Sequence, residues 1–225
     1  MGTIINSIAV LIGSLIGLTL KSKFTENMRK ILMDALGLVC IYLGLQMALK
    51  GEKFLHLVFS LVIGGIIGEL LNIDGIFKDI SNKVEEKFSR GEKGTFAKGF
   101  LTASLLYCIG PMTIMGSIQD GLGQTPTILL TKSLLDGTAS IALSSALGIG
   151  VAFSSLSVLI VQGTITLLAN LVSPILTEIV VREMTAVGGI LVLGIAFNLL
   201  ELKNIKVANL LPALLLIILF VKIFP

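Results

Sequence analysis

Charged and aromatic residues are scarce in this sequence. Only 14% of the 225 residues are Asp, Glu, Lys or Arg, tryptophan is absent, and His56 is the one histidine. So few charges are far below the roughly 25% typical of soluble domains, and a lone histidine argues against a histidine-based catalytic centre or a zinc site. The two cysteines, Cys40 and Cys108, lie inside apolar runs, so we interpret them as core residues and infer no disulfide.

The chain is instead rich in apolar residues, which make up 54% of it and give a mean hydropathy of +0.99. A helix needs about 20 mostly apolar residues to cross the hydrocarbon core of a membrane. Runs of this kind cover residues 3–20, 31–49, 54–71, 99–118, 127–150, 151–176, 184–200 and 207–224. We therefore predict an all-α fold, a polytopic transmembrane helix bundle of about 7–8 spans, in a single integral membrane domain over residues 1–225.

The run at residues 99–118 is the least regular, because Gly110 and Pro111 interrupt it near its middle. Glycine permits backbone conformations that other residues avoid, and proline removes a backbone donor and disrupts a helix interior. We expect a broken helix at this point, formed either by two half-helices or by a re-entrant segment. The number of spans depends on which of the two forms.

Basic residues indicate the orientation of the bundle, since Lys and Arg are retained on the cytoplasmic side. With eight spans and an external N-terminus, twelve of the 17 Lys and Arg residues fall in cytoplasmic loops, within residues 21–30, 78–98 and 203–206. We therefore predict that both termini lie outside. The charged segment 73–98 is interpreted as a solvated amphipathic helix on the cytoplasmic face, with contact to anionic lipids as an additional role.

Residues 1–72 and 150–225 resemble each other and flank a central segment, residues 99–149. The matching segments are residues 6–12 with 154–160 and residues 35–46 with 187–198. The first span corresponds to the sixth, five crossings later, so the two copies face opposite sides of the membrane. Inverted repeats of this kind are typical of secondary transporters. The prediction holds only if segment 99–118 crosses the membrane.

Lys132 and Asp136 lie one helical turn apart in the apolar run 127–150. A charge in hydrocarbon costs at least about 2.5 kcal/mol, so such residues face a protein interior or a watery cavity. One interpretation is a self-neutralising pair that holds helices together, or a lysine that snorkels toward the interface. The other is a binding site, in which Lys132 attracts an anionic group or Asp136 binds and releases a cation or proton. The sequence leaves both open.

Further polar residues are candidates for the same substrate-binding site. They are Ser140 in the same run, Asn6 in the first run, Gln119 and Asp120 after the Gly110-Pro111 break, and Gln162, Thr166 and Asn170 in the sixth run. The last three follow i, i+4, i+8 spacing and so form one polar stripe, which either bonds neighbouring helices or faces a solute. The freed backbone groups at Gly110 and Pro111 are also candidate ligands.

Three runs resemble a bacterial membrane family. They are the opening MGTIIN with Gly13 and Gly17, the GPM and GSIQDG motifs within residues 110–121, and KSLLDG at residues 132–137 followed by GIGV at residues 148–151. The family is the domain-of-unknown-function family that includes the YqgA and YdfK proteins, and the resemblance covers essentially the whole chain. It implies a multi-pass protein of the bacterial cytoplasmic membrane, and it supplies neither a substrate nor catalytic residues.

The sequence contains no motif for nucleotide binding, nucleophilic catalysis or a zinc site, so we expect no enzyme, no cofactor and no metal ion. The basic residues form no patch for nucleic acid. The function that fits best is a small secondary transporter of a polar or ionic solute across the lipid bilayer. A passive channel and a non-transporting membrane scaffold or sensor partner are the alternatives. The small, glycine-rich chain also favours a homo-oligomer.

Overall fold

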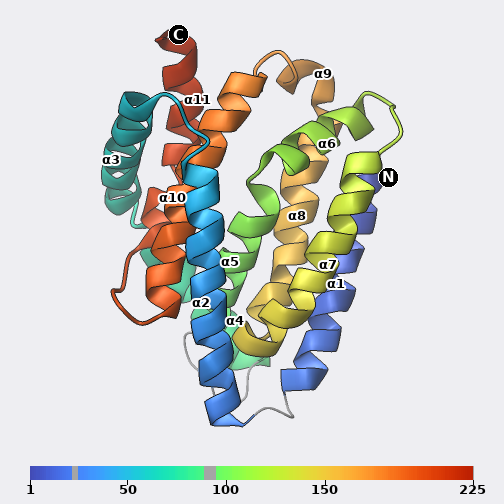
Figure 1. Ribbon diagram of the computed structural model, residues 1–225, viewed down its shortest axis with the longest axis vertical. Coiled ribbons are helices and arrows are strands. Elements are labelled where there is room, and N and C mark those ends of the chain that lie inside the picture. The colour runs from blue at the N-terminus through green and yellow to red at the C-terminus, as the bar shows by residue number, and fades with distance from the viewer. Residues whose placement is uncertain (22–24, 89–94, 225) are drawn as a thin grey trace.

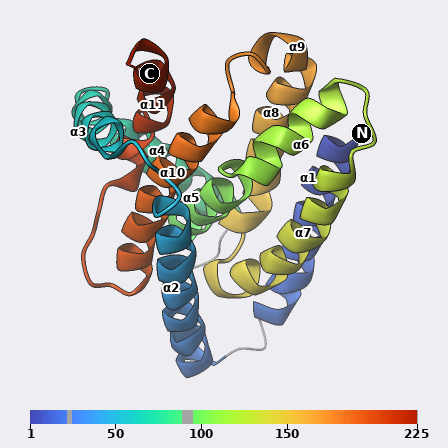
Figure 2. The same ribbon diagram turned by 45° about the horizontal axis from the view of Figure 1, so that its top comes forward.

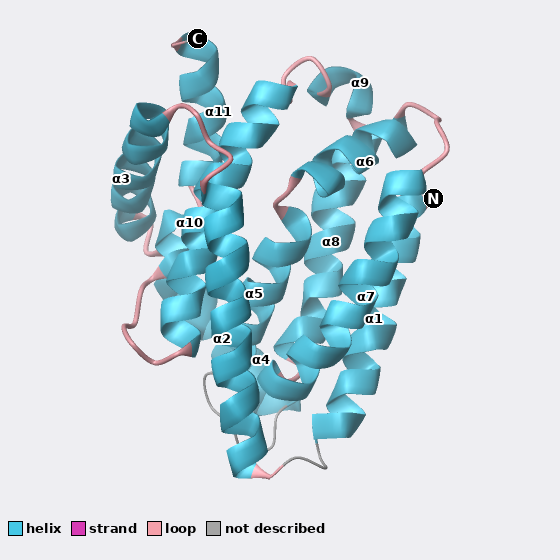
Figure 3. Cartoon of the chain, in the orientation of Figure 1, coloured by secondary structure: helices cyan, strands magenta, loops and turns pink. Residues whose placement is uncertain are grey.

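The computed structural model describes residues 1–21, 25–88 and 95–224, which form helices joined by short loops (Figure 1; Figure 3). The helices are α1 (Gly2–Lys21), α2 (Glu26–Ala48), α3 (Phe54–Leu70), α4 (Ile73–Phe88), α5 (Thr95–Cys108), α6 (Pro111–Gly121), α7 (Thr127–Leu147), α8 (Gly150–Leu167), α9 (Ala169–Val172), α10 (Glu178–Leu199), the 3-10 helix η1 (Val207–Leu210) and α11 (Ala213–Ile223). No strand occurs in this part of the chain. The predicted all-α fold is confirmed.

Within the described residues, four helices are long and apolar enough to cross a membrane, namely α1, α2, α8 and α10. The bent pairs α3–α4 and α5–α6 raise this number to six if each pair forms one span. Large apolar side chains such as Ile4, Leu38 and Tyr42 point outward from the bundle, which fits a protein surrounded by lipid. The chain is thus a polytopic helix bundle, while the count of 7–8 spans stays a prediction because α7 and α11 do not meet these criteria.

The predicted break at Gly110 and Pro111 is confirmed. Helix α5 ends at Cys108, α6 begins at Pro111, and the two axes differ by 60°, so that α6 leans away from α5 in Figure 2. Gly110 has φ 156° and ψ 157°, a region that is essentially restricted to glycine. Pro111 occupies the first position of α6, where the missing backbone donor costs nothing.

Helices α1 and α7 lie side by side with their backbones in close approach. A Cβ atom on Gly13 would overlap the carbonyl oxygen of Gly137, and one on Gly17 would overlap that of Ile141. The residue numbers rise together along the two helices, so α1 and α7 run parallel. This contact holds the start of the chain against the helix that carries Lys132.

Three other helix pairs run antiparallel. Helix α8 packs along α1, α10 along α2, and α11 along α3, and each pair runs in opposite directions in Figure 1. At the crossing of α1 and α8, the hydroxyl of Ser7 donates to the carbonyl oxygen of Ser155 at 2.8 Å. Both termini lie in the upper half of Figure 1, and α4 lies in the lower half.

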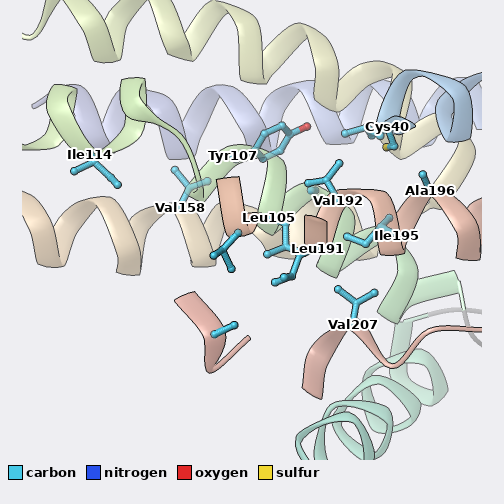
Figure 4. Close-up of a cluster of buried hydrophobic side chains, with 14 of the residues drawn as sticks. Cys40, Leu105, Tyr107, Ile114, Val158, Leu191, Val192, Ile195, Ala196 and Val207 are labelled. Atoms are coloured by element: carbon cyan, nitrogen blue, oxygen red, sulfur yellow. The ribbon is translucent and has the colours of Figure 1, made fainter. Parts of the chain in front are cut away.

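The apolar core lies where α5, α8 and α10 meet. Leu105, Tyr107, Val158, Leu191 and Val192 are buried members of one cluster, which Figure 4 shows. Helix α10 contributes most of its length to this core, since 72% of its most apolar 18-residue stretch is buried, compared with 17% of that of α2. Helix α10 is thus a central element, although its sequence is as apolar as that of the outer helices.

Two predicted boundaries were wrong. The run 151–176 gives α8 only as far as Leu167, followed by the separate turn α9, and Pro174 stops any helix beyond Ser173, the residue before it. Helix α10 begins at Glu178, six residues before the predicted start, where the side chain of Thr177 accepts from the backbone N–H of Val180 at 3.5 Å. Residues 22–24 and 89–94, part of the charged segments used to predict orientation, lie outside the described residues.

Candidate functional site

Lys132 and Asp136 form a buried ion pair on α7. The lysine Nζ lies 2.8 Å from Oδ1 and 2.7 Å from Oδ2 of the carboxylate, because i, i+4 spacing puts the two side chains on one face of the helix. Each residue is only 6% exposed. Lys132 therefore turns into the protein instead of snorkelling toward the interface.

The ion pair is connected to two other helices. From α1, the amide nitrogen of Asn6 donates to Oδ2 of Asp136 at 3.0 Å. Ser140 donates to the backbone carbonyl of Asp136 at 2.7 Å, and its Oγ lies 2.8 Å from the hydroxyl of Tyr107 on α5. Lys132 Nζ also lies 5.9 Å from the centroid of the Tyr107 ring, within the range of a cation–π contact.

Tyr107 was not among the residues predicted from the sequence. The available signal was a phenol inside an apolar run, three residues before the Gly110-Pro111 break. A buried tyrosine hydroxyl needs a hydrogen-bond partner, so such a residue points to a polar neighbour. The neighbour, Ser140, lies on another helix and could not be named from the sequence.

Polar groups without hydrogen-bond partners lie on α1 and on the adjacent helix α8. Thr166 Oγ1 lies 3.1 Å from Thr3 Oγ1 of α1, which sets the level of the two antiparallel helices. Gln162, one turn from Thr166, and Asn6, one turn from Thr3, lie on the same side of this contact and so at similar depth. Gln162 is fully buried, yet neither polar atom of its amide has a partner, and Asn6 Oδ1 has none either.

Helix α6 contributes Ser117, which the sequence analysis also missed. Its hydroxyl is fully buried without a partner, and α6 packs against α7 and α8. Gly121, one turn further on, lies so close to α8 that a Cβ would overlap the carbonyl oxygen of Thr166. The only signal for Ser117 in the sequence was a small hydroxyl residue next to Gly116. Small residues of this kind are common wherever membrane helices pack, so the pattern does not indicate a binding site.

The other predicted residues lie around this centre without joining the ion pair. Asp120, at the end of α6, forms an ion pair of 3.0 Å with the amino group of Met1, and Gln119 Oε1 has no partner. Asn170 lies in α9 and is exposed, so it does not continue the stripe of Gln162 and Thr166. The stripe is interrupted because α8 ends at Leu167. Gly110 and Pro111 shape the bend between α5 and α6.

This arrangement forms a polar centre between α1, α5, α6, α7 and α8, with two opposite charges and several amide and hydroxyl groups. Opening of the ion pair would offer Lys132 to an anionic group or Asp136 to a cationic one. In the described residues no cluster of His, Cys, Asp and Glu has the composition of a metal site. The centre is thus suited to binding a small charged or zwitterionic solute through hydrogen bonds.

Comparison with known proteins gives a match over nearly the whole chain. Residues 1–222 match the model of the family described as "Protein of unknown function (DUF554)". The chain is 37% identical to "Uncharacterized membrane protein YdfK" of Bacillus subtilis (strain 168) over 219 residues, which is 96% of this chain and 93% of the relative. It is 29% identical to "Uncharacterized protein YqgA" of Escherichia coli (strain K12) over 220 residues, covering 96% and 94%.

No solved structure matches the chain. The name of the relative YdfK and the apolar helices of this chain agree on a membrane-embedded protein. The match to the family model covers the polar centre, the α5–α6 break and all helices described above except the last residue of α11. The chain therefore belongs to the DUF554 family of membrane proteins.

Proposed function

We propose that this protein is a small secondary transporter of a polar or ionic solute, with its binding site at the polar centre between α1, α5, α6, α7 and α8. The observation that carries the proposal is an excess of buried polar groups over partners. Gln162, Asn6 and Ser117 each have at least one buried side-chain atom without a hydrogen bond. A buried group left in this state costs about 1–3 kcal/mol. A bound solute would supply the missing partners and remove this cost.

The Lys132–Asp136 pair gives the site its charge selectivity. The pair is neutral as a whole, so an empty site carries no net charge into the membrane interior. A charged group of the solute would replace one member as the partner of the other, which keeps each charge compensated, as intramembrane charges require. Asn6 would follow Asp136 in this exchange, because its amide already donates to the carboxylate.

The bend between α5 and α6 supports a gating role for α6. Broken helices occur at membrane depth where they line a cavity or are buried in protein. Ser117 on α6 adds a buried hydroxyl to the centre, and Gly121 lies against the backbone of α8 near Thr166. A change in the 60° angle would therefore move one wall of the site while α5 stays in the core.

The antiparallel helix pairs support the inverted repeat. With the offset of 152 residues between the second matching segments, Gly37 corresponds to Gly189 and Ala48 to Leu200. A Cβ on Gly37 would overlap the side chain of Leu200, and one on Gly189 would overlap the backbone of Ala48, so corresponding contacts recur. Two halves related in this way can exchange conformations, which is the basis of alternating access.

A non-transporting scaffold is the second candidate. Both carboxylate oxygens of Asp136 are paired, and Asn6 adds a further donor. A satisfied buried pair of this kind can serve only to specify how helices pack. The two candidates differ in what they predict for Gln162, since a scaffold gains nothing from an amide without partners.

The relative YdfK is named as a membrane protein of a bacterium, which supports a location in the bacterial cytoplasmic membrane. In the bacterial cytoplasmic membrane, the proposed orientation puts both termini outside and α4 inside. The exposed apolar faces of α1 and α2 are the surfaces on which a homo-oligomer would form. Solute and lipid are the partners that this arrangement calls for.

The test is a thermal-shift screen of the purified protein against inorganic ions and common metabolites, with the variants Gln162→Leu and Gln46→Leu. A solute at 100 times its dissociation constant stabilises the wild type by about 2.7 kcal/mol. In Gln162→Leu we expect this shift to vanish, while the solute-free protein becomes more stable by about 1–3 kcal/mol because an unpaired buried amide is removed. Gln46, exposed on α2, is the matched control and should leave the shift unchanged.

A solute found in the screen is then offered to proteoliposomes. Saturable uptake by the wild type and its loss in Gln162→Leu support the carrier. If no solute shifts the wild type and Gln162→Leu is destabilised, the amide is part of the packing and the scaffold replaces the transporter. Flux that does not saturate with solute concentration identifies a channel.

A further inference from the structure

A second polar cavity lies outside the proposed transport site. It has a volume of about 260 Å³ and is formed by α4, α5, α10 and the segment leading into η1. This volume is slightly below the roughly 300–1,000 Å³ of sites for drug-sized ligands, so the cavity suits a small group. Its exposed lining residues, such as Lys78 and Asn82, show that it opens to the surface.

The polar lining of the cavity carries a net positive charge. Lys78 forms an ion pair of 2.7 Å with Asp74, also in the lining, and the two charges cancel. Lys98, a half-buried residue of the lining, has no ion pair with any described residue. The remaining positive charge is thus the ammonium group of Lys98, which is available to an anionic partner.

Thr102 provides an independent indication of a ligand. It lines the cavity one turn from Lys98 on α5, is 0% exposed, and its hydroxyl has no hydrogen-bond partner. Because i, i+4 residues share a face of a helix, Lys98 and Thr102 point to the same side of α5. An oxygen-rich anion would accept hydrogen bonds from the ammonium group and from the hydroxyl together.

Apolar side chains make up the rest of the lining, including Phe77, Leu101 and Leu199. A phosphate ion alone would leave these groups without contacts, whereas a phosphate ester with an apolar portion would cover them. We propose that this cavity binds the phosphate group of an anionic amphiphile, with Lys98 and Thr102 holding the phosphate oxygens. Anionic phospholipid and a soluble phosphate ester are the two sources of this chemistry.

The proposal is independent of transport, because no residue of the cavity belongs to the Lys132–Asp136 centre. Lys98 lies on α5 two to three turns before Tyr107, which marks the proposed transport site on the same helix. Occupation of the cavity would fasten α4 to α5 and α10.

The experiment measures binding of phosphatidylglycerol to the purified full chain in detergent by native mass spectrometry. Phosphatidylcholine and glycerol phosphate are offered in parallel. The variants are Lys98→Gln, Thr102→Val and Lys83→Gln. The last removes an exposed lysine of α4 that does not line the cavity, so it controls for the loss of one positive charge.

We expect phosphatidylglycerol to bind in preference to phosphatidylcholine, and Lys98→Gln to weaken this binding roughly tenfold, the value of one charge-assisted hydrogen bond. Thr102→Val should weaken it by about threefold, as the loss of one weaker hydrogen bond does, and Lys83→Gln should not. Binding of glycerol phosphate with the same dependence on Lys98 would identify a soluble ester as the source. Equal effects of Lys98→Gln and Lys83→Gln would overturn the proposal. So would a failure of both phosphatidylglycerol and glycerol phosphate to bind.

Discussion

Glu183 is a buried carboxylate that the predicted spans 151–176 and 184–200 put in the loop between them. It lies in α10 with no exposed surface, and it accepts hydrogen bonds from the backbone N–H groups of Glu52 at 2.9 Å and Lys53 at 3.3 Å. These amides precede the first turn of α3, where backbone donors lack partners within the helix. Gly51 allows this approach, since it lies against Ala186 and Glu183. One side chain thus ties the α2–α3 loop to α10.

We therefore expect Glu183→Ala to lower the free energy of unfolding by about 1–3 kcal/mol, because two backbone donors lose their acceptor. Glu183→Gln retains a carbonyl oxygen and should lose less. Thermal unfolding in detergent measures both. Glu178→Ala, an exposed position in the same helix, serves as the control, and an equal effect there would show that Glu183 has no special role.

At the scale of elements, the bend between α5 and α6 is a place where the backbone preference can be changed without disturbing the packing. Gly110 has a backbone conformation that residues other than glycine rarely adopt. A Cβ atom added at this position would have no neighbouring atom within 4 Å. A substitution there changes the backbone preference without creating a clash. The position therefore separates the effect of the bend from the effect of packing.

Gly110→Ala should destabilise the protein by about 1–3 kcal/mol through backbone strain alone. The matched control is Gly163→Ala on α8, which also meets no atom within 4 Å but lies inside a helix with ordinary backbone angles. There alanine should raise stability by up to about 1 kcal/mol, because it is the better helix former. Thermal unfolding of both variants checks the prediction, and a neutral Gly110→Ala would contradict it.

For the whole molecule, the arrangement of helices places the α2–α3 loop and α4 at opposite ends of the bundle (Figure 1). Together with the distribution of basic residues in the sequence, this geometry predicts which end faces the cytoplasm. Lys50 lies in the α2–α3 loop and Lys83 lies on α4, and both are exposed.

With Cys40 and Cys108 replaced by alanine, single cysteines at these two positions report on orientation. An impermeant maleimide should label Lys50→Cys in intact cells, and it should label Lys83→Cys only after the membrane is permeabilised. The reverse pattern would mean an inverted orientation. Labelling of both positions from the same side would contradict the bundle as a membrane-spanning structure.

Much of the fold follows from local sequence. Each apolar run contains at least one helix, and the Gly110-Pro111 break and the i, i+4 pair of Lys132 and Asp136 appear where they were predicted. These features depend on residues within one or two turns of each other, so composition and spacing are enough to predict them. The end of α8 at Leu167 was missed because apolar composition continues into α9, and the start of α10 at Glu178 was missed because its first turns carry the charged residues Glu178, Arg182 and Glu183.

The sequence by itself determined that this protein is a helical membrane bundle, where its apolar helices lie, and that one of them carries a charged pair one turn apart. Only the tertiary structure decided which groups meet that pair. Asn6 and Asp136 are 130 residues apart in the chain yet hydrogen-bonded. That the buried amide of Gln162 has no hydrogen-bond partner is visible only once α8 is packed. The physical reason is that a hydrogen bond depends on a distance of about 3 Å, which helix packing sets and the order of residues does not.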